Sequence, residues 1–295
     1  MDSPVAVARR TAPSIVFLRS EIPAQHPSAV VLGEERMGTA VAVGPHQVLT
    51  AHYLVLGAAR LEVAGPEGRG RAVRASTLDH ESGLALLSLD GAPLPPVEIA
   101  PHPAAPGLPV FLMTCTSERE RKGASGHVST VGPFEAFWEY MLDRAIMTTV
   151  INPGLAGAPL FDPDGRLVGI VSLGLAAVAR YSLAIPMELF LARREALERG
   201  EGPEGARAWL GFYPQGYDGG VVLTGVVPGG PADRAGLARG DLILSVDGAP
   251  VSSLRELYRT IWKRAPGESL SLQVLRDSAI RVVEVAAGDR YEFYK

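Results

Sequence analysis

The chain has 295 residues, which at about 100–200 residues per domain predicts two or three folding units. Its formal net charge of −4, without a Lys/Arg-rich cluster carrying interleaved aromatic residues, argues against nucleic acid as a partner. The single cysteine, Cys115, excludes an internal disulfide, and no Cys/His spacing is typical of a zinc site, so we expect neither a metal nor another cofactor. Cys115 itself is expected to be a buried strand residue.

The sequence predicts no membrane span. The apolar stretch 167–179 carries no charged residue but has only 13 residues, whereas a helix that crosses a bilayer needs about 20. The N-terminal residues carry an acid at position 2 and lack the apolar core of a signal peptide. We therefore expect either a cytoplasmic protein or one that has lost a leader.

Short strands separated by turn residues fill the first two thirds of the chain and are typical of an all-β barrel or sandwich. After a short helix at 4–10, the first set of strands is expected at 14–18, 38–43, 48–50, 61–63, 70–75 and 84–89. The proline-rich stretch 91–109 cannot supply central strands, so we interpret it as the connection between two barrels. A second set is expected at 110–114, 126–130, 147–151, 160–161, 167–173 and 181–186.

A helix at 187–199 follows, so the first domain is expected over 1–200, with its barrels at 13–92 and 108–186. Residues 201–205, EGPEG, are interpreted as a linker. The remaining residues, 206–295, predict one small α+β domain with strands at 220–227, 269–275 and 280–285. Its helix is expected to start at a capping box, Ser253 with Glu256, and to end near Arg264.

Several separated motifs give the first domain a specific resemblance to a known family. Residues 13–16 (PSIV), 38–41 (GTAV), 126–129 (GHVS) and 182–186 (SLAIP) resemble motifs of the HtrA/Deg serine proteases in order and spacing, and 154–160 (GLAGAPL) is similar to that family's GNSGGPL. The resemblance implies an all-β double barrel of the trypsin/chymotrypsin type followed by an α+β PDZ domain. It also implies a homo-oligomer, trimeric or larger, and a periplasmic or other extracytoplasmic setting.

The same resemblance locates the catalytic triad, and none of its three positions carries a catalytic side chain. Ala156 stands at the nucleophile's position, Tyr53 at the base's position and Gly83 at the position of the orienting carboxylate. A phenol with a pKa of about 10 stays protonated at neutral pH and cannot serve as the base. His52 is the alternative base but lies one residue out of register, and Asp79 is expected to be a turn residue.

The loop before the nucleophile position is expected to form at most a vestigial oxyanion hole. Gly154 allows the turn that would direct the backbone N–H groups of Leu155 and Ala156 inward. Leu155 and Ala158, however, replace a small polar residue and a glycine of the family motif. Three different replacements in the triad indicate a natural pseudoprotease.

The C-terminal domain resembles a PDZ domain in residues 226–232 (VVPGGPA), 235–237 (AGL) and 246–248 (VDG). A PDZ groove offers backbone donors to a peptide carboxylate and a free strand edge beside an apolar helix face. We expect the donors at Leu210, Gly211 and Phe212, because glycine lets the chain turn its N–H groups toward an anion.

On the helix, Leu257 and Ile261 are expected to line the groove, with Leu254 and Tyr258 as alternatives at the same helical spacing. The expected partners are protein C-termini or extended peptides.

Together these expectations predict a catalytically inactive HtrA-like pseudoprotease that acts as a peptide-binding scaffold or regulator through its PDZ domain. One alternative is an active HtrA-like endopeptidase of protein quality control with a non-standard triad that uses His52. A second is a holdase-type chaperone whose barrels still grip extended peptides beside the former active site.

Overall fold

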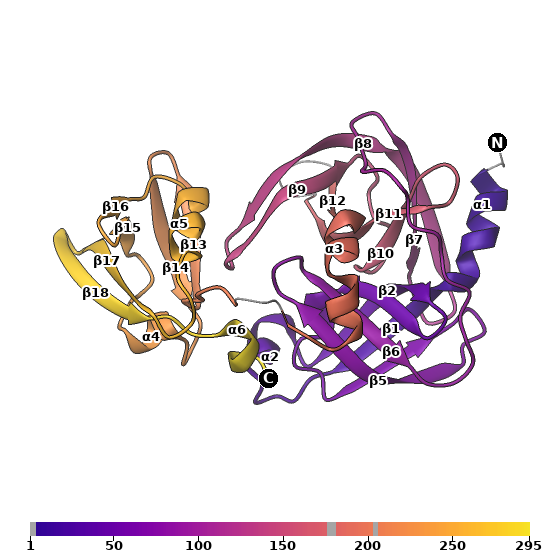
Figure 1. The fold of residues 1–295 in the computed structure, drawn as a ribbon, viewed down its shortest axis with the longest axis horizontal. Helices are drawn as coiled ribbons and strands as arrows, with labels where there is room; N and C mark the ends of the chain where they lie inside the picture. Colours follow the sequence, from indigo (N-terminus) through magenta and orange to yellow (C-terminus); the bar gives the residue numbers. More distant parts are fainter. Residues whose placement is uncertain (1–3, 176–180, 203–205) are drawn as a thin grey trace. The chain divides into compact units, whose positions relative to one another are not determined.

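The computed structural model describes residues 4–175, 181–202 and 206–295, so residues 203–205 of the expected linker lie outside the described part. The chain divides into two compact units (Figure 1). The first consists of residues 1–133 and 143–202, and the second of residues 134–142 and 203–295. Residues 134–142 lie within the range expected for the second barrel, but by their contacts they group with the C-terminal residues.

The first unit contains two closed six-stranded barrels, which confirms the predicted double barrel. The first barrel has the strand order β1-β2-β3-β6-β5-β4. Its strands are β1 (Ile15–Glu21), β2 (Glu35–Gly44), β3 (Gln47–Ala51), β4 (Arg60–Ala64), β5 (Gly70–Asp79) and β6 (Leu84–Leu89). Helix α1 (Pro4–Thr11) and a 3-10 turn (Ala12–Ser14) precede it. A second helix, α2 (Pro27–Leu32), lies between β1 and β2, where no helix was predicted.

The second barrel has the strand order β10-β11-β12-β9-β8-β7. Its strands are β7 (Pro109–Cys115), β8 (Arg121–Ala136), β9 (Tyr140–Thr148), β10 (Ala158–Phe161), β11 (Leu167–Gly174) and β12 (Ser182–Pro186). Helix α3 (Met187–Glu198) follows directly. All four residues of β10 are buried, because this short strand pairs with β7 on one side and β11 on the other.

Strands β8 and β9 differ most from expectation. The sequence predicted strands at 126–130 and 147–151, whereas β8 is 16 residues long and β9 starts seven residues before the predicted strand, at Tyr140. The alternation of partly buried and exposed residues along β8 gives no strong apolar face, so hydrophobic pattern alone does not reveal its length. The two strands continue beyond the barrel, and their joined ends form residues 134–142 of the second unit.

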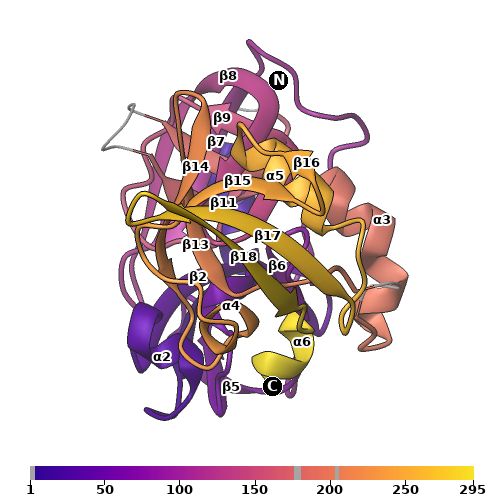
Figure 2. The ribbon, with the colours of Figure 1, turned by 90° about the vertical axis from the view of Figure 1, so that its left-hand side faces the viewer.

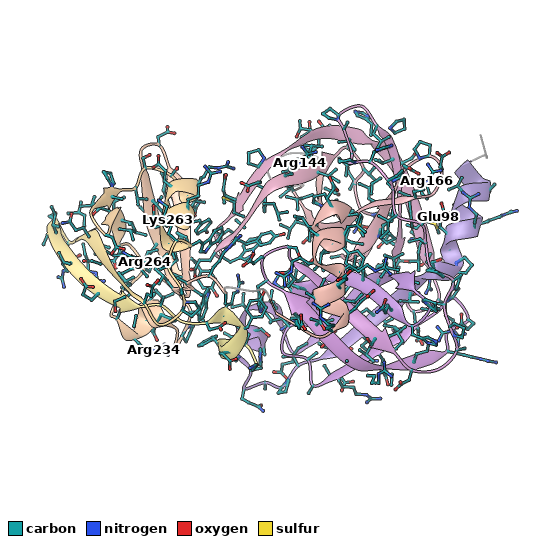
Figure 3. All side chains as sticks on the ribbon, viewed as in Figure 1. Glu98, Arg144, Arg166, Arg234, Lys263 and Arg264 are labelled. Atoms are coloured by element: carbon teal, nitrogen blue, oxygen red, sulfur yellow. The ribbon has the colours of Figure 1, made fainter. Side chains whose placement is uncertain are left out.

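The connection at 91–109 is held in place along much of its length. The Val97 N–H donates to the Ala42 carbonyl (2.9 Å), and Ile99 forms an isolated bridge with Leu167. The Arg166 guanidinium lies 3.7 Å from the Glu98 carboxylate, and both side chains are labelled in Figure 3. The proline-rich stretch therefore forms an ordered strap within the first unit.

The second unit is a PDZ-type sheet with short helices, which confirms the predicted α+β domain. Its sheet has the order β13-β14-β15-β17-β18, with β16 pairing to β15 (Figure 2). The strands are β13 (Phe212–Tyr217), β14 (Gly220–Val226), β15 (Leu242–Val246), β16 (Ala249–Pro250), β17 (Ser269–Arg276) and β18 (Ala279–Ala286). The helices are α4 (Pro231–Arg234), α5 (Leu254–Ile261) and α6 (Arg290–Phe293).

Helix α5 begins as predicted and ends earlier. The Ser253 hydroxyl accepts the Glu256 N–H (3.2 Å), but the Glu256 carboxylate accepts the N–H of Ser252 rather than that of Ser253. The helix stops at Ile261 instead of Arg264, with Trp262 at its C-terminal cap. Among the described residues, no helix is long and apolar enough to cross a bilayer.

Candidate functional sites

In the loop at the expected nucleophile position, the backbone N–H groups of Gly154 and Leu155 donate to acceptors within the protein. The Leu155 N–H donates to the Cys115 carbonyl (3.0 Å), and the Gly154 N–H donates to the side-chain oxygen of Asn152 (3.1 Å). The Leu155 carbonyl in turn accepts the Thr114 hydroxyl (2.8 Å) and the Asn152 amide (3.1 Å). The Leu155 amide expected to point toward an oxyanion is therefore directed into the second barrel.

Ala156 and Gly157 lie against the first barrel. The Ala156 carbonyl accepts the Thr39 N–H (2.7 Å), and the Ala156 methyl packs against the apolar core of that barrel. Gly157 has a φ of +82°, and a Cβ there would lie 2.1 Å from the Thr39 carbonyl oxygen. Only glycine fits at this point, so the motif keeps its backbone course although its serine is absent.

Tyr53, at the expected base position, makes a structural hydrogen bond. It lies in a 3-10 turn (His52–Leu54) directly after β3, and its hydroxyl donates to the carbonyl of Ser172 on β11 (2.7 Å). Burial raises the pKa of the phenol far above its ordinary value of 10.0. The side chain thus joins the two barrels and holds its proton at neutral pH.

His52 is buried, with 6% of its surface exposed. Its ring lies edge-on to that of His80, with the ring centroids 5.3 Å apart. The His52 backbone N–H donates to the Gly83 carbonyl (2.8 Å), so positions 52 and 83 are neighbours. Gly83 has a φ of +79° and offers no side chain to orient a histidine.

Asp79 is a turn residue with a fully buried carboxylate. It accepts the Ser82 hydroxyl (2.8 Å) and the Glu81 N–H (3.1 Å), and the Arg193 Nε lies 3.6 Å away. The carboxylate thus closes the turn after β5 on its own loop. Within the described ranges, no three His, Cys, Asp or Glu side chains are grouped so that they could hold a metal ion.

In the second unit, the loop before β13 binds a carboxylate that belongs to the same chain. The Leu210 N–H donates to Oε1 of Glu139 (2.9 Å), and the N–H groups of Gly211 (2.7 Å) and Phe212 (3.3 Å) donate to Oε2. Gly211 has a φ of +72°, which is the conformation that lets consecutive N–H groups converge on one anion. The three residues expected to supply the donors are therefore brought together around an acid.

Glu139 lies in the segment between β8 and β9 and is 4% exposed. Its backbone is also bonded: its N–H donates to the Tyr258 hydroxyl (3.1 Å), and its carbonyl accepts Nη1 of Arg290 (3.2 Å). Burial raises the pKa of the Glu139 carboxyl to about 7, although the N–H groups of the loop and the charge of Arg290 act in the opposite direction. This is the functional residue that sequence reasoning missed.

Helix α5 presents a different set of side chains to this segment than expected. Leu257 and Ile261 are both fully buried in the apolar core of the second unit. Tyr258, held as an alternative, donates its hydroxyl to the Ala136 carbonyl, and Arg255 forms an ion pair with Glu135. The nearest sequence signal for this contact is the row of aromatic and acidic residues in 134–140, FEAFWEY.

Comparisons with known proteins agree with this architecture. Residues 38–170 match the family described as "Trypsin-like peptidase domain", and residues 208–286 match "PDZ domain". A "Probable periplasmic serine endoprotease DegP-like" of Halomonas elongata is 31% identical over 269 residues, covering 82% of this chain and 54% of its own length. The protein of the same description from Ectopseudomonas mendocina is 30% identical over 261 residues, with the same shares of both chains. The chain thus spans about half the length of these curated relatives.

Solved structures match over nearly the whole chain. "HtrA-type protease AlgW with tripeptide" shares 25% identity at a TM-score of 0.56, covering 98% of both chains. The serine endoprotease from Yersinia pestis shares 24% identity at a TM-score of 0.59, again with 98% of both chains covered, and this likeness concerns the fold. The two barrels, the PDZ-type unit and these relatives lead to one assignment: the chain belongs to the HtrA family of trypsin-like serine proteases with a PDZ domain.

Proposed function

We propose that this chain is a catalytically inactive HtrA-family protein that binds protein C-termini or extended peptides through its PDZ domain, with the double barrel as a scaffold. The observation that carries the first half is Ala156, which the family motif aligns with the nucleophile and which has no hydroxyl. Serine-protease chemistry needs a hydroxyl, a base and an orienting carboxylate, and Ala156, Tyr53 and Gly83 supply none of them.

Other nucleophiles near the loop support this reading because they are inaccessible. Thr39, Thr50 and Thr114 are fully buried, and the hydroxyls of Thr50 and Thr114 donate to backbone carbonyls. Cys115 is also buried, and burial raises the pKa of its thiol, so the reactive thiolate is disfavoured. His52 is buried against His80 and is not open to a substrate.

The binding half rests on the loop at 210–212, whose N–H groups already hold a carboxylate. A terminal carboxylate presents the same two oxygens as a glutamate side chain, so the loop has the chemistry to accept one. Two solved structures of the HtrA-type protease AlgW are described with a tripeptide and with a decapeptide, which supports a peptide-binding role here.

The test of inactivity uses the full chain with a fluorophosphonate probe and with an unfolded protein as substrate. We expect no covalent adduct and no cleavage, since removal of a complete triad lowers kcat by about 10⁶ in a well-studied protease. Restoring only the hydroxyl, as Ala156→Ser, should not restore labelling, because the base and carboxylate positions still hold Tyr53 and Gly83.

A reproducible cleavage rate that His52→Ala abolishes would contradict the proposal and favour a protease with a non-standard base. His102→Ala is the matched control, since His102 is an exposed histidine on the 91–109 strap. Suppression of aggregation that persists when the PDZ loop is blocked would instead favour a chaperone activity of the barrels.

A further inference from the structure

We propose that residues 134–142 are an internal, displaceable ligand of the PDZ groove, in which Glu139 occupies the place of a peptide's terminal carboxylate. Peptide and segment then exclude one another. This inference rests on the proposed peptide-binding function and adds the regulation of the same site. The inference starts from a long-range contact: Glu139 and Leu210 are 71 residues apart in the sequence, yet Glu139 and the loop at 210–212 meet within one compact unit.

The donors of the loop are fully used. Each backbone N–H carries one proton, and the N–H groups of Leu210, Gly211 and Phe212 all point at the two oxygens of Glu139. A second carboxylate cannot take the same protons at the same time. A peptide C-terminus can therefore bind here only after the Glu139 side chain has left.

The segment also contacts the helix that borders the groove. The Tyr258 hydroxyl on α5 donates to the Ala136 carbonyl and accepts from the Glu139 N–H. One side chain of the helix thus bonds two backbone groups of the segment. Nε of Arg255 donates to Oε1 of Glu135 (2.7 Å). The segment thus meets both the carboxylate loop and α5, as a bound peptide would.

Two features make the bound state easy to reverse. Glu139 has a φ of +53°, a left-handed conformation that a residue with a Cβ adopts at a cost. Its carboxylate is nine-tenths or more buried, so an ionised side chain there gives up its hydration. The neighbouring Phe137 is 53% exposed and adds little apolar burial to the contact.

The test measures peptide binding by the full chain and its variants. The probe is an equimolar pool of fluorescein-labelled heptapeptides that end in Ala, Val, Leu, Ile or Phe with a free carboxylate, followed by fluorescence anisotropy. The amidated pool controls for carboxylate recognition. The variants are Glu139→Ala and Glu139→Gln, and Glu284→Gln is the charge-matched control on the exposed side of β18.

We expect Glu139→Ala to bind the free-carboxylate pool about tenfold more tightly than the unmodified chain, since a tethered ligand of about 0.1 mM affinity competes at a millimolar effective concentration. Glu139→Gln should lie between the two, and Glu284→Gln should match the unmodified chain. Hydrogen exchange provides the second measurement: the amides of 210–212 should lose protection in Glu139→Ala.

Equal binding of the free-carboxylate pool by the unmodified chain and Glu139→Ala would overturn the inference while leaving PDZ binding intact. Unchanged exchange at 210–212 in Glu139→Ala would overturn it as well. If no variant distinguishes the free from the amidated pool, the proposed peptide-binding function itself fails, and the competition fails with it.

Discussion

The ionisation of Glu139 makes the stability of the second unit depend on pH. The pKa of its carboxyl is raised from an ordinary value of 4.5 to about 7, chiefly because burial disfavours the charged form. The charged or titratable groups that face it are Arg290 on α6, Tyr258 on α5, Tyr213 on β13 and Tyr294 after α6. The pKa values of the three tyrosines are raised, so none of them titrates between pH 4 and 8.

The direction of the effect follows from proton linkage. Between pH 4.5 and about 7 the folded unit binds a proton that the unfolded chain has released, so raising the pH over this window favours unfolding. The contribution is fully present below pH 4.5 and is lost as the pH rises through about 7. The two pKa values differ by about 2.5 pH units, which corresponds to about 3 kcal/mol at 1.36 kcal/mol per unit.

Tryptophan fluorescence during urea unfolding is a suitable assay, because Trp138, Trp209 and Trp262 all belong to the second unit. We expect the free energy of unfolding of the unmodified chain, relative to that of Glu139→Gln, to fall by about 3 kcal/mol between pH 4.5 and 8. The glutamine variant supplies the matched reference, since it keeps the side chain's shape and removes its titration. A difference that is constant or that increases with pH would refute the reasoning, since it would mean that the loop's N–H groups outweigh desolvation.

Three substitutions test other parts of the structure. Tyr258→Phe removes a hydroxyl that donates to one backbone group of the segment and accepts from another, and should destabilise the second unit by about 1–3 kcal/mol in the same fluorescence assay. Gly157→Ala should lower the melting temperature of the first unit in calorimetry, because the φ of Gly157 is +82° and the new Cβ would lie 2.1 Å from the Thr39 carbonyl oxygen. An unchanged melting temperature would show that the backbone of this loop takes another course. Arg36→Met should destabilise the first unit by about 3 kcal/mol or more in calorimetry, since the buried guanidinium donates to four backbone carbonyls.

Much of the double barrel was predictable because its strands are short, apolar and separated by glycine and proline turns. Strand β6 was predicted at its observed limits, and β12 was predicted to start one residue before its observed start at Ser182. The turn residue Asp79 was also predicted, since its role depends on local backbone chemistry rather than on distant partners.

The role of Glu139 could not be predicted in the same way. Nothing within its own stretch distinguishes it from an exposed acid such as Glu118, because its burial depends on donors in a loop 71 residues away in the sequence. The side chains of α5 were difficult to assign from the sequence for a related reason: the same helix contributes to the apolar core and to the contact with residues 134–142. Helical spacing placed Leu257 and Tyr258 close together, and both are buried in the core of the second unit, but only the structure shows that the Tyr258 hydroxyl also bonds the segment.

The composition of the second unit from two distant stretches matters for anyone who dissects this protein. A fragment beginning after the 201–205 linker would have the whole C-terminal sheet but would lack Glu139. The N–H groups of its loop at 210–212 would then have no internal carboxylate, unlike those of the intact chain. Affinities measured on such a fragment would overstate what the whole molecule achieves. The reciprocal fragment, ending before the linker, would present Phe134, Phe137 and Trp138 without their neighbours and would tend to self-associate.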